Sequence, residues 1–599
     1  MNRHFLQLAI LLCYFAGYRL LLWSHFAIWP LRSVDLRGLF GDIFISCLLV
    51  FTAHLMPKRI QSHWYIATAV ALIIAHLANY EVILATGGSI QFAHLQFALQ
   101  GTMARGSIIR IGHISILCWS ALILWLLIRV ELKHRNSVSA SPRFRSSAMA
   151  AILIVPLGWN VLNKNFSPAT AHWRQFNFIV GNIHDFALTI TPSAKRKQIA
   201  GEMGTLLKHS SMPSIPDLQG TPIAKLNKDQ RPNIILIMGE GIAGARFPQN
   251  RNEEKKYHEM TSMQFLADRG LYIPNYIGLN RVTNNGQFSI LCGMTPNLNV
   301  LSPKMDMYDP ARDGKCMPQT FKENGYRTVY LQGAWLEFMN KMRFMSLAGF
   351  SQIMGANVFD SSEMGSPWGA DDDVLFRKSL SIIESLNESS EAPWFLAILT
   401  VGTHHPFSGG RNHKSRFPQE SLEHSMSFLD EQLLQFFKQL ENQGTLRDTL
   451  VILTSDESSG VGDIERDTVY QNWLPLIVAG PGIAPKIKND GLFSTADIAI
   501  SLTDYVFASD IAQNSFDGRS VFRSYDNERN IVFGNDFYRH VGVFNGTSSS
   551  ITCDHYLKIC TKNVWNEPSF RTWEQARFTN HEELNHIQDI LDRSQWYPK

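Results

Sequence analysis

Five long apolar stretches in the first third of the chain constrain its folding more than any other feature. They run from Phe5 to Trp23, Leu39 to Leu55, Trp64 to Leu84, Ile111 to Leu127, and Ala148 to Leu162. A bilayer core about 30 Å thick needs roughly 20 mostly apolar residues as helix, because lipid offers no partner for unpaired backbone groups. Any one stretch alone could be a buried helix of a soluble domain. Five in succession predict a transmembrane domain with five helices over residues 1–165.

The charges divide at the same boundary. Residues 1–165 contain 14 Lys and Arg but only 4 Asp and Glu, which leaves 41 basic and 48 acidic residues for the rest of the 599-residue chain. The overall net charge of +3 therefore averages two different parts. Seven Cys are too few for a disulfide scaffold. We also expect no nucleic-acid partner.

The basic loops predict an orientation. Residues 129–145 hold five Lys and Arg, and Lys58 and Arg59 lie on the same side if the spans alternate. Basic loops stay in the cytoplasm, so the N-terminus is expected inside and the chain after Asn165 outside. We expect a multi-pass protein of the bacterial cytoplasmic (inner) membrane with a periplasmic second half. Four Arg residues fall on the predicted outer side of the membrane, so the excess of basic residues on the cytoplasmic side is only moderate.

Two charges, Arg19 and Asp42, fall within or at the edge of predicted spans. Charge at that depth is costly and often functional. Snorkelling to the membrane interface is the interpretation we favour, and contact with a lipid headgroup is the alternative.

Residues 166–228 are predicted to be a juxtamembrane linker, and residues 229–599 an extracytoplasmic α/β domain. Short β-branched runs separated by helical stretches are typical of a mainly parallel central sheet. The candidate strands are 233–238, 328–331, 395–400, 449–454 and 474–478.

Polar or ionisable groups follow four of these strands. Glu240 follows the first, Trp335 stands in the turn after the second, His404 and His405 follow the third, and Asp456 and Glu457 the fourth. Open α/β sheets bind ligands beyond the carboxyl ends of their strands, so these groups are expected at one edge. Asp456 and Glu457 could instead cap the next helix.

Three acids and one hydroxyl suggest a metal-assisted reaction. Glu240, Asp456 and Glu457 could hold a divalent cation, which polarises a phosphoryl oxygen and lowers the pKa of a bound hydroxyl. The segment 280–289 supplies candidate nucleophiles, among them the hydroxyls of Thr283 and Ser289, because a hydroxyl bound to the metal can act as an alkoxide.

The Cys of the second half can form disulfides outside the cytoplasm. Cys292 with Cys316 and Cys553 with Cys560 are the short-loop arrangement among three possible connectivities. The Cys in the predicted spans are expected to pack as small apolar side chains.

The order of these motifs resembles the alkaline phosphatase superfamily. It comprises strand-Glu240, a turn with Thr283 before a helix ending in Cys292-Gly293, Trp368-Gly-x-Asp-Asp, Thr403-His-x-Pro-Phe, and Ser455-Asp456. Within it, the chain is similar to the sulfatase-like membrane transferases typified by lipoteichoic acid synthase and the phosphoglycerol transferases of periplasmic glucans. The resemblance covers about residues 233–508 and the membrane architecture. A sulfatase is disfavoured, because Cys292-Gly-Met-Thr-Pro departs from Cys/Ser-x-Pro-x-Arg.

The resemblance implies roles for individual residues. Glu240, Thr283 and Asp456 correspond to metal ligands, with Thr283 also the nucleophile, and His404 to a contact with the phosphoglycerol headgroup. The remaining substrate-binding candidates are Trp335, Asn340, Lys341 and Arg281. Arg281 could hold phosphate or be an exposed turn residue. The acids 371–373 are expected to be a solvated helix start, and His405 a structural histidine.

Two departures qualify the resemblance. Glu457 stands where the family has His, which adds negative charge and favours Mg²⁺ or Mn²⁺ over Zn²⁺. Ala334 stands where teichoic acid synthases carry an acidic substrate contact, so a different acceptor is expected.

The implied function is transfer of a phosphoglycerol-type headgroup from a phospholipid to a cell-envelope glycan, through a phospho-threonine intermediate. The donor would be phosphatidylglycerol or phosphatidylethanolamine. One alternative is a phosphoethanolamine transferase acting on lipid A or glycan. The other is a catalytically degenerate protein of envelope glycan assembly, which the Glu457 substitution keeps open.

Overall fold

The computed structural model describes most of the chain. The described residues are 3–25, 31, 33–86, 88–90, 111–133, 172–182, 216–226, 230–250, 257–296, 305, 308–407, 409–458, 471–507, 511–512, 516, 518–535, 540–554, 559–565 and 573–578. They form two compact units, one from residues between 3 and 182 and the other from residues between 216 and 578. Each unit is described by itself.

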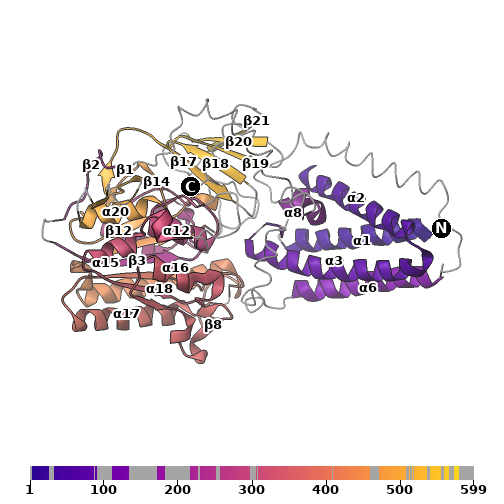
Figure 1. Cartoon of the computed structure of the whole chain (residues 1–599), viewed down its shortest axis with the longest axis horizontal. Helices are drawn as coiled ribbons and strands as arrows, with labels where there is room; N and C mark the ends of the chain where they lie inside the picture. The colour runs from indigo at the N-terminus through magenta and orange to yellow at the C-terminus, as the bar shows by residue number, and fades with distance from the viewer. Residues whose placement is uncertain are drawn as a thin grey trace. The chain divides into compact units, whose positions relative to one another are not determined.

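The first unit is a bundle of helices (Figure 1). Its members are α1 (Arg3–His25), α2 (Ser33–Leu55), α3 (Lys58–Thr86), α6 (Ile111–Lys133) and the short α8 (His172–Gln175). α1 packs against α2 and α6, and α6 also packs against α3.

Three helices of this unit are long and apolar enough to cross a membrane. The qualifying stretches are Phe5–His25, Ile60–Leu84 and Ile111–Lys133, whereas the apolar part of α2 is the shorter Gly38–Ala53. The fifth predicted span, Ala148–Leu162, lies outside the described residues. The described part of the chain therefore has three candidate spans, where the sequence predicted five.

Arg19 and Asp42 do not snorkel, because they pair with each other. Both are 4% exposed and form an ion pair between α1 and α2. Arg19 also donates to the carbonyl oxygens of Trp173 (3.0 Å), Arg174 (3.3 Å) and Phe176 (3.2 Å) at the end of α8. Together with two bonds to Asp42, these acceptors occupy all five guanidinium N–H groups. Arg19 therefore has no donor left for a lipid headgroup.

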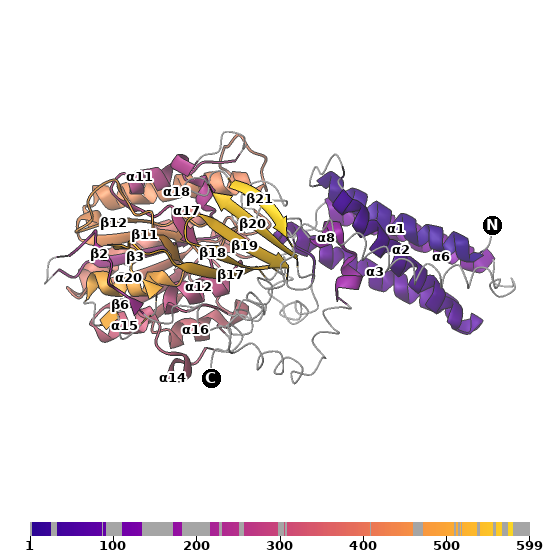
Figure 2. The same cartoon turned by 90° about the horizontal axis from the view of Figure 1, so that it is seen from above.

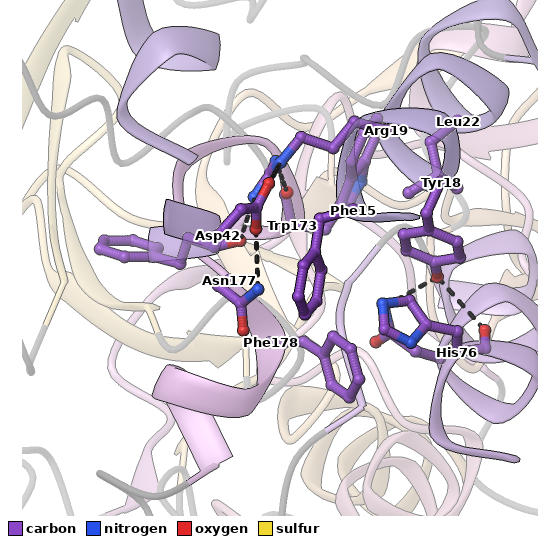
Figure 3. A pocket seen from close by; sticks show the side chains of 11 residues that line it. Phe15, Tyr18, Arg19, Leu22, Asp42, His76, Trp173, Asn177 and Phe178 are labelled. Carbon is purple, nitrogen blue, oxygen red and sulfur yellow. Dashed lines mark hydrogen bonds and ion pairs between the residues drawn. The ribbon is translucent and has the colours of Figure 1, made fainter. Parts of the chain in front are cut away.

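A second buried pair holds α8 to the bundle. Arg174 binds both carboxylate oxygens of Asp35 at 2.7 and 2.6 Å, and both side chains are fully buried. Asn177 donates to Asp42 at 2.7 Å, and Figure 3 shows this bond beside the Arg19 pair. The small cavity between them, about 20 Å³, is also lined by Tyr18 and His76. α8 is thus fastened to α1 and α2 by charge and not by apolar packing alone.

An eight-stranded sheet forms the centre of the second unit. Its strand order is β13 (Ile487–Lys488), β4 (Gly270–Tyr272), β12 (Ile477–Ala479), β11 (Thr449–Ser455), β3 (Asn233–Gly239), β10 (Trp394–Leu399), β6 (Arg327–Gln332) and β7 (Gln352–Met354). The strands from β11 to β7 are parallel, as the sequence predicted for four of them. β12 is antiparallel to both of its neighbours, so the sheet is mixed.

Helices cover both faces of this sheet. Alternate residues of β3 point to opposite faces: Ile234, Leu236 and Met238 join one core cluster, and Ile235 and Ile237 the other. The first cluster includes α12 (Thr283–Cys292), α15 (Met317–Glu323), α16 (Lys341–Leu347) and α20 (Asp497–Val506). The second includes α11 (Thr261–Ala267), α17 (Asp372–Ser389) and α18 (Leu422–Asn442). Figure 2 shows these two helix layers on either side of the strands.

The C-terminal part adds an antiparallel sheet that we did not predict from the sequence. It is a meander of β17 (Asn530–Asn535), β18 (His540–Asn545), β19 (Ser549–Asp554), β20 (Ile559–Trp565) and β21 (Trp573–Phe578). Gly534 of β17 donates its N–H to the carbonyl of Leu279 at 2.9 Å, which joins this sheet to the segment before Thr283. Cys553 and Cys560 occupy facing backbone positions on β19 and β20. Their disulfide stays a prediction.

The expected linker contributes structure to both units. Its residues 172–182 belong to the helical bundle. Farther on, β1 (Pro216–Asp217) pairs with β15 (Gly518–Arg519), and β2 (Thr221–Pro222) pairs with β16 (Arg523–Ser524). The chain therefore enters the second unit by adding two short strands to it.

Candidate functional site

Glu240 lies immediately after β3 and is held by the loop after β10. Its N–H donates to Thr400 Oγ1 at 2.8 Å, and Thr403 Oγ1 donates to its carbonyl oxygen at 2.5 Å. The residue is only 4% exposed. The backbone of Glu240 is therefore fixed by two neighbouring strand ends.

Asp456 lies beside Glu240 because β11 and β3 are parallel neighbours with Ser455 opposite Gly239. Its Oδ1 accepts N–H groups from Gly241 at 3.3 Å and from Glu457 at 2.9 Å. Its Oδ2 is buried and receives no hydrogen bond from an amide or hydroxyl group, and the side chain that hydrogen-bonds to the Asp456 carboxyl is the neighbouring acid Glu240. The strand register therefore brings Glu240 and Asp456 together at one edge of the sheet, as the sequence predicted.

The acids of this cluster interact with one another. Burial, followed by the charges of Asp456 and Glu457, raises the pKa of Glu240 well above its usual value. Burial also raises the pKa of Asp456, and burial with the charge of Asp456 raises the pKa of Glu457 to about 8. The cluster therefore retains protons at neutral pH, which an entering cation would displace.

The donor set fits a hard cation. Carboxylate oxygens and a hydroxyl are ligands of Mg²⁺ and Mn²⁺, and two adjacent buried acids, Glu240 and Asp456, are a costly arrangement that a cation would relieve. Within the described residues, no group of three His, Cys, Asp or Glu side chains has the geometry to hold a metal by itself. Any ion here would need the hydroxyl of Thr283 or a ligand from outside the chain.

Thr283 is the first residue of α12 and is half-buried. One turn later, Gly286 packs so closely on the next strand end that a Cβ there would lie 1.8 Å from the carbonyl oxygen of Asp456. Residues three apart lie on the same face of a helix. Thr283 is therefore on the face of α12 that meets Asp456.

α12 carries polar side chains in a fully buried setting, which sequence reasoning missed. Asn284 and Asn285 are at most 2% exposed, and the amide nitrogen and oxygen of each are buried without a hydrogen-bond partner. Such groups cost about 1–3 kcal/mol each unless a ligand satisfies them. The signal available in the sequence was the Asn-Asn pair directly after Thr283.

The other hydroxyl of this helix is structural. Ser289 is fully buried and donates its hydroxyl to the carbonyl of Asn285 at 3.0 Å. Cys292, at the end of α12, forms a disulfide with Cys316, which precedes α15.

Lys341 is the predicted substrate residue that the structure brings to the acids. Met339 and Asn340 before it both have positive φ, 55° and 56°, an unusual backbone for residues with side chains. This turn directs Lys341 inward, where it is 4% exposed. Burial lowers the pKa of Lys341, while Glu240 and Asp456 act to raise it.

The neighbours of Lys341 lie less deeply. Asn340 is exposed and Trp335 is half-buried.

Arg281 is buried and supports the acidic turn. It is 8% exposed, and its Nε donates to the carbonyl of Ser458 at 2.9 Å. Its charge also opposes the rise in the pKa of Glu457. The interpretation as an exposed turn residue is therefore wrong.

His404 belongs to an aromatic wall. Its ring lies 4.5 Å from that of Trp368, which in turn lies 5.1 Å from Phe338. Trp368 stands in the turn between β8 (Met364–Ser366) and β9 (Gly369–Ala370). His404 Nδ1 donates to the carbonyl of His405 at 2.6 Å. Burial lowers the pKa of His404 to about 4, so the ring is neutral near pH 7.

The acids 371–373 are not merely a solvated helix start. Asp372 is fully buried, and its Oδ1 accepts the N–H groups of Val401 and Gly402 at 3.2 Å. Asp371 accepts the N–H of Gly410 at 3.0 Å. These acids therefore hold both ends of the loop that carries His404. Burial raises the pKa of Asp372 to about 7.

Comparison with known proteins identifies a family for this part of the chain. Residues 232–506 match the family model described as Sulfatase. Phosphoglycerol transferase I of Xanthomonas euvesicatoria pv. vesicatoria (strain 85-10) is 25% identical over 305 residues, which cover 48% of this chain and 42% of that protein. Phosphoglycerol transferase I of Salmonella paratyphi B (strain ATCC BAA-1250 / SPB7) is 28% identical over 250 residues, 39% of this chain and 32% of that protein. The chain thus matches less than half the length of these curated relatives.

Solved structures share the fold. An alkaline phosphatase superfamily protein from Vibrio parahaemolyticus has a TM-score of 0.52 at 15% identity, over 68% of this chain and 95% of that one. The lipoteichoic acid synthase LtaP from Listeria monocytogenes has a TM-score of 0.50 at 14% identity, over 63% and 95%. At these identities the likeness concerns the fold alone.

Proposed function

We propose, from the premise that residues 232–506 form a domain of the Sulfatase family, that this chain is a membrane-bound phosphoglycerol-type transferase. It would move the headgroup of a phospholipid, phosphatidylglycerol or phosphatidylethanolamine, to a cell-envelope glycan. The relatives named phosphoglycerol transferase I support this reaction class. The observation that carries the proposal is that α12, which begins at Thr283, packs through Gly286 against the turn of Asp456, beside the buried acid Glu240.

The reaction proceeds in two displacements. Thr283 Oγ attacks phosphorus, its proton passes to the departing diacylglycerol oxygen, and a phospho-threonine forms. An acceptor hydroxyl then attacks the same phosphorus, and its proton returns to Thr283 as the P–O bond to threonine breaks. Each displacement inverts phosphorus, so the complete transfer retains configuration.

Glu240, Asp456 and Thr283 would hold a divalent cation, with Glu457 as a further ligand. Such an ion, when bound, neutralises phosphoryl charge and lowers the pKa of a hydroxyl. Oxygen ligands favour Mg²⁺ or Mn²⁺ over Zn²⁺. The close approach of the two buried acids Glu240 and Asp456 supports this assignment.

Lys341 and the buried amides of α12 contribute positive charge and hydrogen-bond donors. Both act where negative charge grows on the equatorial phosphoryl oxygens, which is the main task in phosphoryl transfer. Lys341 interacts with Glu240 and Asp456. Asn284 is buried beside Thr283 with an unpartnered amide.

The aromatic wall would hold the headgroup itself. His404 is neutral, so it binds a headgroup hydroxyl by hydrogen bonding and not as a cation. Trp368 positions this ring. Trp335 and Asn340 remain proposed substrate contacts, and Arg281 is proposed to steady the Glu457 turn.

A membrane location suits this donor. Three apolar helices precede the domain. The basic loop after α6 is expected in the cytoplasm, and the predicted span Ala148–Leu162, outside the described residues, would then carry the chain to the periplasmic side of the inner membrane. The catalytic groups would then face a substrate that resides in the outer leaflet.

The test uses the full chain in detergent with labelled phosphatidylglycerol or phosphatidylethanolamine and Mn²⁺, Mg²⁺ or Zn²⁺. We expect metal-dependent release of diacylglycerol that is lost in Thr283→Ala and kept in Ser289→Ala, since Ser289 is buried in the same helix. Mass spectrometry should find the phosphoglycerol or phosphoethanolamine group bound to Thr283. Absence of release from either lipid with every metal would refute the transferase and favour a non-catalytic role in glycan assembly.

The relative rates with the two lipids separate phosphoglycerol from phosphoethanolamine transfer. A Glu457→His variant tests the unusual acid: as a ligand, it should shift metal preference toward Zn²⁺. Unchanged affinity for every metal would show that residue 457 is not a ligand.

A further inference from the structure

A cavity in the second unit takes no part in the chemistry proposed above. It has a volume of about 360 Å³ and is bordered by residues 488–493, 524–529 and 546–547. None of the site residues described above lines it. Pockets of about 300–1,000 Å³ hold small ligands or parts of larger ones.

The strand register places this cavity at the same sheet edge as Glu240 and Asp456. Lys488 of β13 pairs with Tyr272 of β4. Across β12, that level corresponds to Leu453 of β11 and then to Ile237 of β3. β13 runs in the direction of β3, so residues after Lys488 emerge at the edge where Glu240 and Asp456 emerge.

The lateral separation follows from the strand order. Three strand intervals separate β13 from β11 and four separate it from β3. At about 4.8 Å per interval, β13, whose Lys488 borders the cavity, lies about 14 Å from the Asp456 strand and about 19 Å from the Glu240 strand. A chain of several sugar units could reach from one to the other.

The floor of the cavity also connects to the nucleophile segment. β14 (Leu492–Ser494) pairs in parallel with β5 (Asn275–Ile277). β5 leads directly into the segment that carries Arg281 and Thr283. The cavity is therefore joined to the nucleophile segment through the paired strands β14 and β5.

The charges of the cavity argue against an anionic ligand. Arg519 pairs with Asp217 at 2.9 Å, Lys488 with Asp490 at 2.8 Å, and Arg529 with Asp497. Asp526 and Glu528 add two exposed carboxylates to the rim. Phosphate or sulfate would have to compete with carboxylates already in place.

The same lining suits a neutral polyhydroxylated ligand. Carboxylates accept hydrogen bonds from hydroxyl groups, and the Asn527 amide both donates and accepts. The Arg519 guanidinium lies 4.6 Å from the Tyr525 ring centroid, and that of Arg529 5.8 Å from the Phe493 ring. Phe493 is fully buried and supports Arg529 from within the fold, whereas Tyr525 is half-buried. The planar Arg519 and Tyr525 groups beside many acceptors match the apolar faces and hydroxyl edges of sugar rings.

We propose that this cavity, the 488–529 subsite, binds neutral oligosaccharide and holds units of the glycan acceptor beyond the unit that receives the headgroup. The identification of its ligand as the acceptor rests on the proposed function. The binding itself depends only on the cavity.

The first test measures binding of the full chain in detergent to neutral gluco-oligosaccharides of increasing length by calorimetry. Replacing the rim acids together, Asp526→Ala with Glu528→Ala, should weaken binding about tenfold, equivalent to about 1.4 kcal/mol. Glu384→Ala, an exposed acid on α17, is the matched control and should leave affinity unchanged. Thr283→Ala should also bind normally.

Three results would overturn the subsite: no oligosaccharide binds, the rim variant binds as tightly as the parent, or a sulfated oligosaccharide binds more tightly than its neutral counterpart.

The second test separates this proposal from the proposed function. In the rim variant, diacylglycerol release without acceptor should match the parent, while the KM for an oligosaccharide acceptor rises and kcat holds. Equal loss of both activities would contradict a role confined to acceptor binding. If the parent binds oligosaccharide but releases no diacylglycerol, the transferase proposal fails and the subsite stands.

Discussion

Gly286→Ala tests whether the contact between α12 and the Asp456 turn positions the nucleophile. The added methyl carbon would lie 1.8 Å from the carbonyl oxygen of Asp456, whereas close C···O contacts are about 3.3 Å. The neighbour is backbone and cannot rotate away. α12 and the turn must therefore separate by about 1.5 Å.

That displacement should reduce catalysis far more than stability. A misplacement of about 1 Å can cost about 100-fold in rate. Overpacking costs about 1–3 kcal/mol, but alanine is favoured over glycine within a helix by about 1 kcal/mol. We expect kcat/KM for diacylglycerol release to fall about 100-fold, with a net loss of about 0–2 kcal/mol in the free energy of unfolding.

Gly278→Ala is the matched control. A Cβ at Gly278 would meet side-chain atoms of Leu474 at 3.0 and 3.3 Å, which can yield, and the carbonyl oxygen of Asn472 at 3.6 Å, which is an ordinary van der Waals contact. It should keep most of its activity. A Gly286→Ala variant as active as this control, with an unchanged melting temperature, would refute the argument that this contact sets the position of Thr283.

Three further predictions concern other parts of the molecule. Lys341→Met should lower kcat about 100-fold, because it removes a positive charge that stabilises the transition state. Metal affinity should stay equal or become tighter, because the competing charge beside Glu240 and Asp456 is gone. A parallel loss of metal binding would indicate that Lys341 has a structural role. Asp372 has a folded-state pKa near 7 against a usual 3.8, so its contribution to stability is present at low pH and lost as pH rises from about 4 to 7. Melting temperatures across that range should show this slope in the parent and a flatter one in Asp372→Asn, and identical slopes would contradict it. Arg19→Ala should lower the free energy of unfolding by about 3–5 kcal/mol, because it leaves Asp42 buried and unpaired. Arg269→Ala, which breaks the exposed pair with Glu441, should lower it by less than about 1 kcal/mol. Thermal unfolding in detergent measures both, and equal losses would contradict a stabilising role for the buried Arg19–Asp42 pair.

The sequence predicted the parallel centre of the sheet because local pattern determines it. The apolar runs that became β3, β6, β10 and β11 are buried on both faces and contain no competing periodicity. Parallel neighbours bring their carboxyl ends together, so Glu240 and Asp456 were predictable as a pair. The apolar helices were predictable for the same reason, since composition and length decide whether a helix can cross a bilayer.

The sequence did not predict the direction of strand β12 or the partners of the buried Arg19. The short run that became β12 reads the same in a parallel or an antiparallel strand, and only its neighbours β11 and β4 decide between them. Arg19 was expected to snorkel because a single span shows no partner. Asp42 comes from another helix and the carbonyl acceptors from residues 173–176, more than 150 positions away.

The candidate site shows the same difference between what local sequence predicts and what tertiary packing decides. The sequence by itself determined which chemical groups stand after which strands, because each motif is local: Glu240, Thr283, His404 and Asp456. Only the tertiary structure decided that Lys341 turns inward through two residues of positive φ, that Asp372 is buried under the His404 loop, and that Gly286 presses α12 on Asp456. The physical reason is that burial and pairing are properties of two segments at once, whereas a motif belongs to one.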